Sequence, residues 1–124
     1  MNFDELPEFT KESKRLGKKY RSLPKDLTEF KRVVEAMPLG NRKHFNVITQ
    51  NHIVSIVKAR LFCRYLKGSS LRIIYAFFKH HQRIEFIELY FKGNKANEDR
   101  GRIKEYLANQ TFTNESQTDL KNTW

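Results

Sequence analysis

Residues 56–95 read IVKARLFCRYLKGSSLRIIYAFFKHHQRIEFIELYFKGNK, and this stretch decides the fold class. It contains three runs that are rich in β-branched and aromatic residues, which favour strands. Between the runs lie a polar segment around Gly68 and the segment 79–82, KHHQ, both typical of turns. A fourth run, HFNVIT, starts at His44 and is separated from the stretch by the polar tripeptide 50–52. The short connections predict four consecutive strands in a mainly antiparallel sheet.

The sequence from Pro7 to Pro38 has a helical rather than an alternating periodicity. Pro7 suits the first turn of a helix. The first apolar stripe consists of Phe9, Leu16, Tyr20 and Leu23. The second stripe, which follows Ser22 and Pro24, consists of Leu27, Phe30, Val33, Val34 and Met37. Together these stripes predict a helical hairpin.

After the strands, Asn97 is placed to cap a short helix. The apolar side chains of this helix are those of Ile103, Tyr106 and Leu107. Residues 109–124 are polar and aperiodic, which predicts a flexible tail behind a single domain at 1–108. We therefore expect an α+β fold in which the helices, an N-terminal helical hairpin and a short C-terminal helix, pack on one face of a curved, mainly antiparallel four-stranded sheet.

The positive charge is concentrated in the middle of the chain. The whole sequence carries a net charge of +10, and residues 37–95 alone hold 11 Lys and Arg against 2 Asp and Glu. Such an excess repels itself unless a polyanion or an acidic partner compensates it. Nucleic acid, the ribosome or an acidic peptide are the partners that this pattern favours, and the alternative is a basic surface that serves only solubility.

Several classes of protein are disfavoured by what the sequence lacks. No run approaches the roughly 20 apolar residues of a membrane span, and the acidic N-terminus lacks a signal-peptide pattern, so we expect a cytoplasmic protein. Cys63 is the only cysteine and lies in an apolar run, which predicts a buried, unreactive thiol. His80 and His81 adjoin without other ligands at metal-binding spacing, so we expect neither a metal nor a cofactor.

Cationic side chains recur on one face of the predicted sheet. Lys58, Arg60 and Arg64 alternate with apolar neighbours and therefore share a face. Arg72 begins the third strand, and Tyr90 and Lys92 stand two residues apart at the end of the fourth. Any one of these side chains could simply lie on a solvated strand face, and Tyr90 could be an aromatic at the edge of the core. Their clustering predicts a basic concavity that suits RNA cleavage, where a phosphorane needs positive donors.

The stretch 56–95 resembles the central sheet of RelE-type toxins, which belong to the RelE/ParE superfamily of type II toxin-antitoxin systems. In those toxins a basic strand is followed by a loop, a strand of the form (Y/L)R(V/I)(I/V)Y, a hairpin and a final strand that runs into a lysine-containing segment. LRIIYAF at 71–77 is the best match to that pattern. With the helical hairpin included, the resemblance covers residues 5–107.

The resemblance implies roles for the matching positions. The implied catalytic residues are Lys58 and Arg60, which contact RNA and assist proton transfer, Arg72, which stabilises the phosphate, and Tyr90 and Lys92. The implied RNA-binding residues are Arg64, Lys67 and Lys95. The chain departs from some relatives in having no histidine near the end of the fourth strand. Glu88 shares a face with Tyr90 and could replace it, or could simply pair with a neighbouring cation.

The function that the resemblance implies is that of a toxin: a metal-independent, ribosome-dependent endoribonuclease that cuts messenger RNA by 2′-hydroxyl attack. It also implies an acidic antitoxin as the cognate partner, beside the ribosome and messenger RNA. One alternative is a binding protein that inhibits gyrase, as in the ParE branch, and another is a nucleic-acid-binding module without catalysis. The basic second strand and Arg72 favour the nuclease, because the gyrase-directed branch generally lacks that set.

Overall fold

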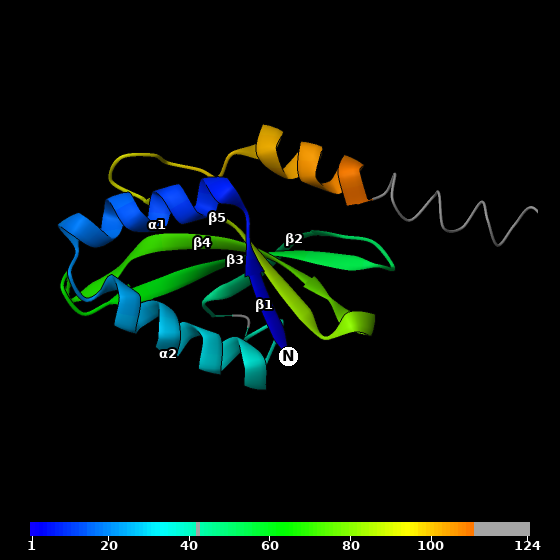
Figure 1. Cartoon of the computed structure of the whole chain (residues 1–124), viewed down its shortest axis with the longest axis horizontal. Coiled ribbons are helices and arrows are strands. Elements are labelled where there is room, and N and C mark those ends of the chain that lie inside the picture. Colours follow the sequence, from blue (N-terminus) through cyan, green and yellow to red (C-terminus); the bar gives the residue numbers. More distant parts are fainter. Residues whose placement is uncertain (42, 111–124) are drawn as a thin grey trace, which may run out of the picture.

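The computed structural model describes residues 1–41 and 43–110. The elements, in chain order, are β1 (Asn2–Glu5), α1 (Pro7–Lys19), α2 (Leu23–Ala36), β2 (Phe45–Gln50), β3 (Val54–Cys63), β4 (Gly68–Phe78), the 3₁₀ turn η1 (Lys79–His81) and β5 (Arg83–Phe91). A further helix follows over residues 100–110 and is called here the C-terminal helix (Figure 1). None of the helices described is long and apolar enough to cross a membrane.

The five strands form one mixed sheet in the order β1-β5-β4-β3-β2. The four predicted strands are present as consecutive antiparallel neighbours. The expectation of four strands is nevertheless wrong, because β1 adds a fifth that runs parallel to β5 and pairs Phe3 with Ile84. Its sequence, NFDE, has one apolar residue and no alternation. The ladder to β5 stabilises this strand, and a pairing so distant in sequence leaves no local signal.

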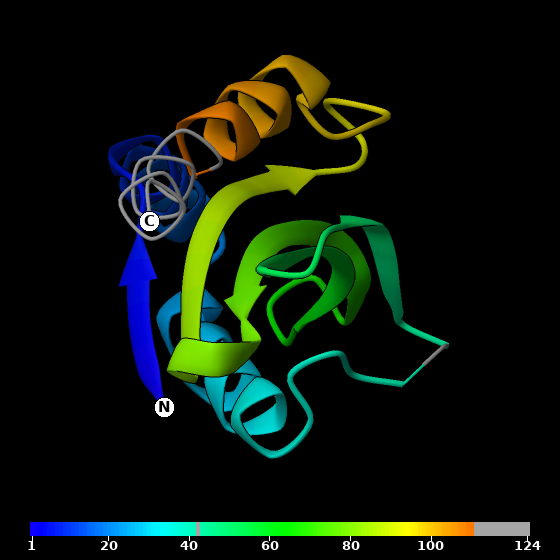
Figure 2. The ribbon, with the colours of Figure 1, turned by 90° about the vertical axis from the view of Figure 1, so that its right-hand side faces the viewer.

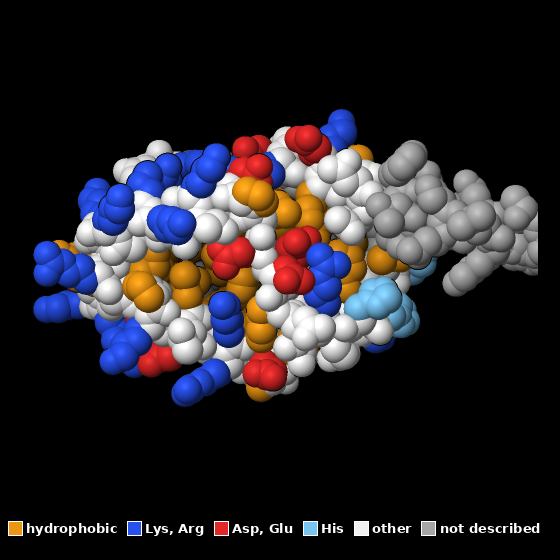
Figure 3. Space-filling view, in the orientation of Figure 1, with side chains coloured by type: hydrophobic (Ala, Val, Ile, Leu, Met, Phe, Trp, Pro, Cys, Tyr) orange, Lys and Arg blue, Asp and Glu red, His pale blue; other side chains and the backbone are white. Residues whose placement is uncertain are grey.

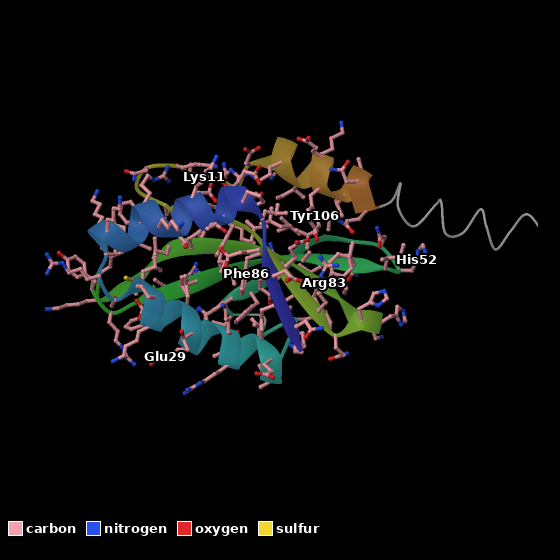
Figure 4. All side chains as sticks on the ribbon, viewed as in Figure 1. Lys11, Glu29, His52, Arg83, Phe86 and Tyr106 are labelled. Carbon is pink, nitrogen blue, oxygen red and sulfur yellow. The ribbon has the colours of Figure 1, made fainter. Side chains whose placement is uncertain are left out.

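The sheet is strongly curved, and its two faces are covered by different helices (Figure 2). We call the face under α1 and α2 the inner face and the opposite one the outer face. The inner core is a large cluster around Phe9, Phe30, Tyr75 and Phe86, the last of which is labelled in Figure 4. The outer core consists of Val54, Ile56, Ile74, Ala76, Phe78, Ile87, Ile103 and Tyr106. The helices were expected on one face only, and this is wrong for the C-terminal helix.

The helical hairpin is confirmed, with a correction to its second stripe. Pro7 occupies the first turn of α1 as predicted. Val33 of α2 and Met37, which follows the last residue of α2, are however 46% and 45% exposed. The buried stripe of α2 instead follows Leu23, Phe30 and Val34, whose spacing keeps them on one side of a helix. Val33 and Met37 are apolar but lie outside that side, so composition alone misplaced them.

The C-terminal helix is anchored by polar contacts to the rest of the fold. Its cap is Asp99, whose Oδ1 accepts the backbone N–H of Arg102 at 2.9 Å, rather than the predicted Asn97. The Arg102 guanidinium donates two hydrogen bonds to the Glu12 carboxylate of α1 in a bidentate pair, at 3.0 and 2.9 Å. Tyr106 reaches toward the sheet in Figure 4 and donates to Glu85 of β5 at 2.7 Å. The helix continues to residue 110, and the rest of the predicted tail lies outside the described residues.

Candidate active site

A cavity of about 250 Å³ opens on the outer face beyond the edge of the C-terminal helix. Its walls come from the segment before β2 and from β2, β3, β4 and the turn after β5. The lining residues are Lys43, His44, Phe45, Asn46, Lys58, Ala59, Arg60, Arg72 and Lys92. Five of these are Lys or Arg, and no carboxylate lines the cavity among the residues described. We call it the cationic cavity, and its lining suits an anion.

The structure brings together four of the five side chains that the sequence marked as catalytic. Lys58 and Arg60 stand two residues apart on β3 and so point to the same face. Arg72 of β4 is the direct cross-strand partner of Arg60. Lys92 follows the end of β5, and its backbone N–H donates to Ser70 at 2.9 Å.

The pairing of Arg60 with Arg72 opposes fold stability. Arg72 is only 8% exposed, and its guanidinium donates to the backbone oxygens of Ser69 and Leu71. Burial lowers the pKa of Arg72, and the charge of Arg60 lowers it further. Within the described ranges neither arginine pairs with a carboxylate, although like charges directly opposite each other destabilise a sheet. The site therefore holds a charge that a bound anion would compensate.

Lys58 differs from the arginines because it has a carboxylate partner. Its Nζ lies 2.8 Å from Oε1 of Glu98, whose side chain is 5% exposed. Burial lowers the pKa of Lys58, but the hydrogen bond to Glu98 and the neighbouring Tyr90 together outweigh burial and raise it. The same hydrogen bond lowers the pKa of Glu98. Lys58 is thus held as an ammonium at the rim of the cavity.

Tyr90 lies behind the wall of the cationic cavity instead of lining it. The side chain is 4% exposed and sits directly opposite Arg72. Its hydroxyl is enclosed and makes no hydrogen bond of ordinary geometry to any residue described, although the Lys58 ammonium acts on it electrostatically. Burial raises the pKa of Tyr90 more than Lys58 lowers it. The hydroxyl is therefore a proton donor rather than a base.

Glu88 and Lys95 form an ion pair with each other close to Tyr90. The Glu88 side chain is fully buried, pairs with the Lys95 ammonium and accepts the backbone N–H of Asp99 at 2.8 Å. The Lys95 Nζ also lies 5.3 Å from the centre of the Tyr90 ring. Glu88 is occupied in this way and does not line the cationic cavity, so the geometry favours a structural role.

Arg64 and Lys67 are placed away from the cationic cavity. The expectation that Arg64 shares a face with Lys58 is wrong, because the β3 register shifts between Leu61 and Cys63 and the strand ends there. The Arg64 guanidinium turns to the α2 side and lies 2.5 Å from Glu29. Lys67 is exposed in the following turn, with a φ of 52°. A role in RNA binding for these two residues stays a prediction.

Sequence reasoning missed Lys43 and His44, which line the cationic cavity immediately before β2. The antiparallel pairing of Phe45 with Ala59 sets His44 opposite Arg60, and the Arg60 N–H donates to the His44 carbonyl at 2.9 Å. Folding the predicted hairpin about Asn51 would have revealed this position. The Nδ1 atom of His44 is enclosed and has no hydrogen-bond partner in the described part of the chain.

Basic side chains are not confined to the cationic cavity. On the face shown in Figure 3, Lys and Arg gather over α1 and at the end of the molecule where α1 meets α2.

Across residues 1–41 and 43–110, no three His, Cys, Asp or Glu side chains stand together as metal ligands. Cys63 is buried, as expected, with its sulfur 3.5 Å from the Ser22 hydroxyl.

A helical hairpin on the inner face of a curved sheet is the arrangement of a RelE-like fold. The chain is similar to a solved archaeal RelE-RelB complex from Pyrococcus horikoshii OT3, with a TM-score of 0.57 and 18% sequence identity. The likeness covers 74% of this chain and 94% of that one. No family model matches the sequence, and no curated protein matches it significantly. The resemblance to RelE-type toxins is thereby confirmed at the level of the fold.

Proposed function

We propose that the protein is the toxin of a toxin-antitoxin pair and acts as a metal-independent endoribonuclease on messenger RNA in the ribosome. The observation that carries this proposal is the composition of the cationic cavity, with five cations, one histidine and no carboxylate among its described lining residues. A cavity of this kind attracts a phosphodiester and stabilises the extra negative charge of a phosphorane. The RelE-like fold supports the same assignment.

The reaction needs only groups that the chain itself offers. The 2′-oxygen of the substrate forms a bond to phosphorus as its proton passes to a base. The bond from phosphorus to the 5′-oxygen then breaks, and the 5′-oxygen leaves with a proton from an acid, giving a 2′,3′-cyclic phosphate and a 5′-hydroxyl. Arg60, Arg72 and Lys92 hold the phosphate oxygens. Lys58 supplies the proton, since an ammonium is a far stronger acid than the 5′-hydroxyl that forms.

Binding to the ribosome accounts for charge beyond the cavity. The net charge of +10 and the cations over α1 exceed what one phosphodiester needs. Ribosomal RNA offers a sequence-independent anionic surface, and affinity for it falls steeply with salt. The same target implies a cytoplasmic location.

The proposed partner is an antitoxin with an acidic segment. The similar structure is described as a complex of RelE with RelB. An acidic segment seated over the cationic cavity would compensate Arg60 and Arg72, which have no carboxylate of their own among the described residues. Complementary charge would also speed the capture of the toxin.

A second candidate function is a nucleic-acid-binding module without catalysis. It is favoured by the ion pair of Lys58 with Glu98, because that pair draws a predicted catalytic ammonium toward a carboxylate. Binding through the remaining cations would continue unchanged, whereas proton transfer by Lys58 would be slowed.

The two functions are separated by mapping the ends of a reporter messenger RNA in a reconstituted translation system. We expect cuts that need the ribosome, and we expect Arg72→Ala to reduce them by about 100-fold or more. Ribosome-free RNA serves as the control for specificity, and His80→Ala, in an exposed turn, serves as the matched variant. If the RNA stays intact and translation is undisturbed, the nuclease assignment is excluded. The next test would then measure gyrase supercoiling.

A further inference from the structure

The cationic cavity has one ionisable side chain that is neither Lys nor Arg. Arginine stays protonated at any physiological pH and cannot accept the 2′-hydroxyl proton. The pKa of Lys58 is raised despite its burial, because Glu98 and Tyr90 outweigh that burial, so this ammonium also keeps its proton. Tyr90 lies behind the wall, and Glu88 is sequestered by Lys95. Among the described residues that line the cavity, His44 is the one whose side chain carries an imidazole nitrogen that can accept a proton.

The main chain of His44 is held in a defined position, and its two ring nitrogens differ in exposure. Its backbone carbonyl accepts the Arg60 N–H at 2.9 Å, which ties the residue to β3 where the catalytic cations stand. The Nδ1 atom is enclosed without a partner, whereas Nε2 is neither enclosed nor hydrogen-bonded within the described part of the chain. A buried polar atom without a partner is costly and is often kept for a functional reason. One ring nitrogen therefore remains available to a substrate.

We propose that His44 is the general base of the reaction, an inference that rests on the proposed ribonuclease function. Nε2 takes the proton of the 2′-hydroxyl as the 2′-oxygen bonds to phosphorus. Lys58 gives its proton to the departing 5′-oxygen, and solvent returns both groups to their starting states. His44 lies just before β2, whereas the resemblance to RelE-type toxins placed proton transfer on Lys58 and Arg60 of β3.

Charges face His44 from two sides, and they shape how its reaction depends on pH. Across the cationic cavity it faces Lys43, Lys58, Arg60, Arg72 and Lys92. On its other side a second cavity, of about 390 Å³, joins it to Asp26 and Glu29 of α2.

The test compares the full chain with His44→Gln, His44→Ala and His80→Ala in the reconstituted translation system. We expect His44→Gln to lower the rate constant of cleavage by about 100-fold or more, the usual contribution of a general base. We expect its Kd for the ribosome to stay within about twofold, because glutamine removes no cation. The dependence of the wild-type rate on pH should change in His44→Gln and persist in His80→Ala. Added imidazole should restore part of the activity of His44→Ala.

The outcomes distinguish this inference from the proposed function. If His44→Gln cuts at the wild-type rate with the wild-type pH profile, His44 is not the base, while the nuclease itself stands. If the wild type does not cut, the proposed function and the role of His44 both fail. If His44→Gln does not fold, the rescue of His44→Ala by imidazole decides: rescue supports the inference, and no rescue by a folded His44→Ala overturns it.

Discussion

The outer face of the sheet has two halves, one apolar and one cationic. Along β3 and along β4, the step from one half to the other takes only two residues. In β3, buried Ile56 is followed on the same face by Lys58, and in β4, buried Ile74 is preceded by Arg72. Ile56 and Ile74 lie under the C-terminal helix, whereas Lys58 and Arg72 line the cationic cavity. The same strands therefore contribute to the core in one half and to the wall of the cationic cavity in the other. The start of the C-terminal helix, just after Glu98, marks where one ends and the other begins.

The largest effect is expected from placing a charge in the half that the C-terminal helix covers. Ile74→Asp places a carboxylate where the side chain is fully buried among apolar neighbours. We expect the free energy of unfolding to fall by about 4 kcal/mol or more, measured by urea denaturation. Ile74→Val is the matched control and should cost only about 0.5 to 1.5 kcal/mol. Equal losses in the two variants would contradict the division of the outer face.

A smaller effect is expected from loosening the cover itself. Arg102→Ala removes the bidentate hydrogen bonds that join the C-terminal helix to Glu12 of α1. We expect a loss of about 1.5 to 3 kcal/mol in urea denaturation, the size of hydrogen bonds to charged groups. Arg100→Ala, whose side chain is 85% exposed, is the control and should leave the denaturation midpoint unchanged. If the C-terminal helix stays protected from hydrogen exchange in Arg102→Ala, the contact between Arg102 and Glu12 is not needed to hold this helix in place.

The border between the halves is the ion pair of Lys58 with Glu98, and it should respond to acid. The pair holds the pKa of Glu98 below that of a free carboxyl group. The stability it contributes is therefore present above the unfolded pKa of about 4.3 and is lost as the pH falls through the lowered folded pKa. Glu98→Gln should flatten the dependence of stability on pH below about pH 4.3, measured by urea denaturation across that range. If the unfolding free energy of Glu98→Gln falls with decreasing pH as steeply as that of the wild type, the ion pair contributes nothing to stability.

The smallest effect is expected in the open half, and it has the opposite sign. Arg60→Gln removes one of two like charges that face each other across β3 and β4. We expect the unfolding free energy to rise by roughly 0.2 to 1 kcal/mol, the size of a cross-strand pair, while cleavage falls. Thermal melting at low salt measures the gain, and high salt should reduce it. A loss of stability would mean that the two guanidinium groups do not repel each other.

The sequence revealed those features that repeat locally. Strand runs, short turns and the helical spacing behind Pro7 predicted two helices and four antiparallel strands, and alternation on β3 placed Lys58 and Arg60 on one face. Features that depend on distant pairing were missed. β1 gains its structure from β5, and the end of β3 at Cys63 turns Arg64 away from the outer face.

The candidate site was predictable in its charge and less so in its proton chemistry. The cluster of cations follows from composition and alternation, and Arg72 from the LRIIYAF pattern. His44 joins the site only when β2 is paired with β3 in register, and Glu98 only when the C-terminal helix is folded onto the outer face. Single-residue properties do not reveal either position, since each depends on a contact between segments.

The place of Glu98 and the C-terminal helix along the chain has a consequence for biosynthesis. Synthesis proceeds from the N-terminus, so residues 98–110 leave the ribosome after every strand of the sheet. Until then Ile56 and Ile74 lack their cover, and the Lys58 ammonium lacks its carboxylate. The nascent chain thus passes through a stage in which an uncompensated cationic face lies beside exposed apolar surface, while still tethered to the RNA-rich particle that makes it.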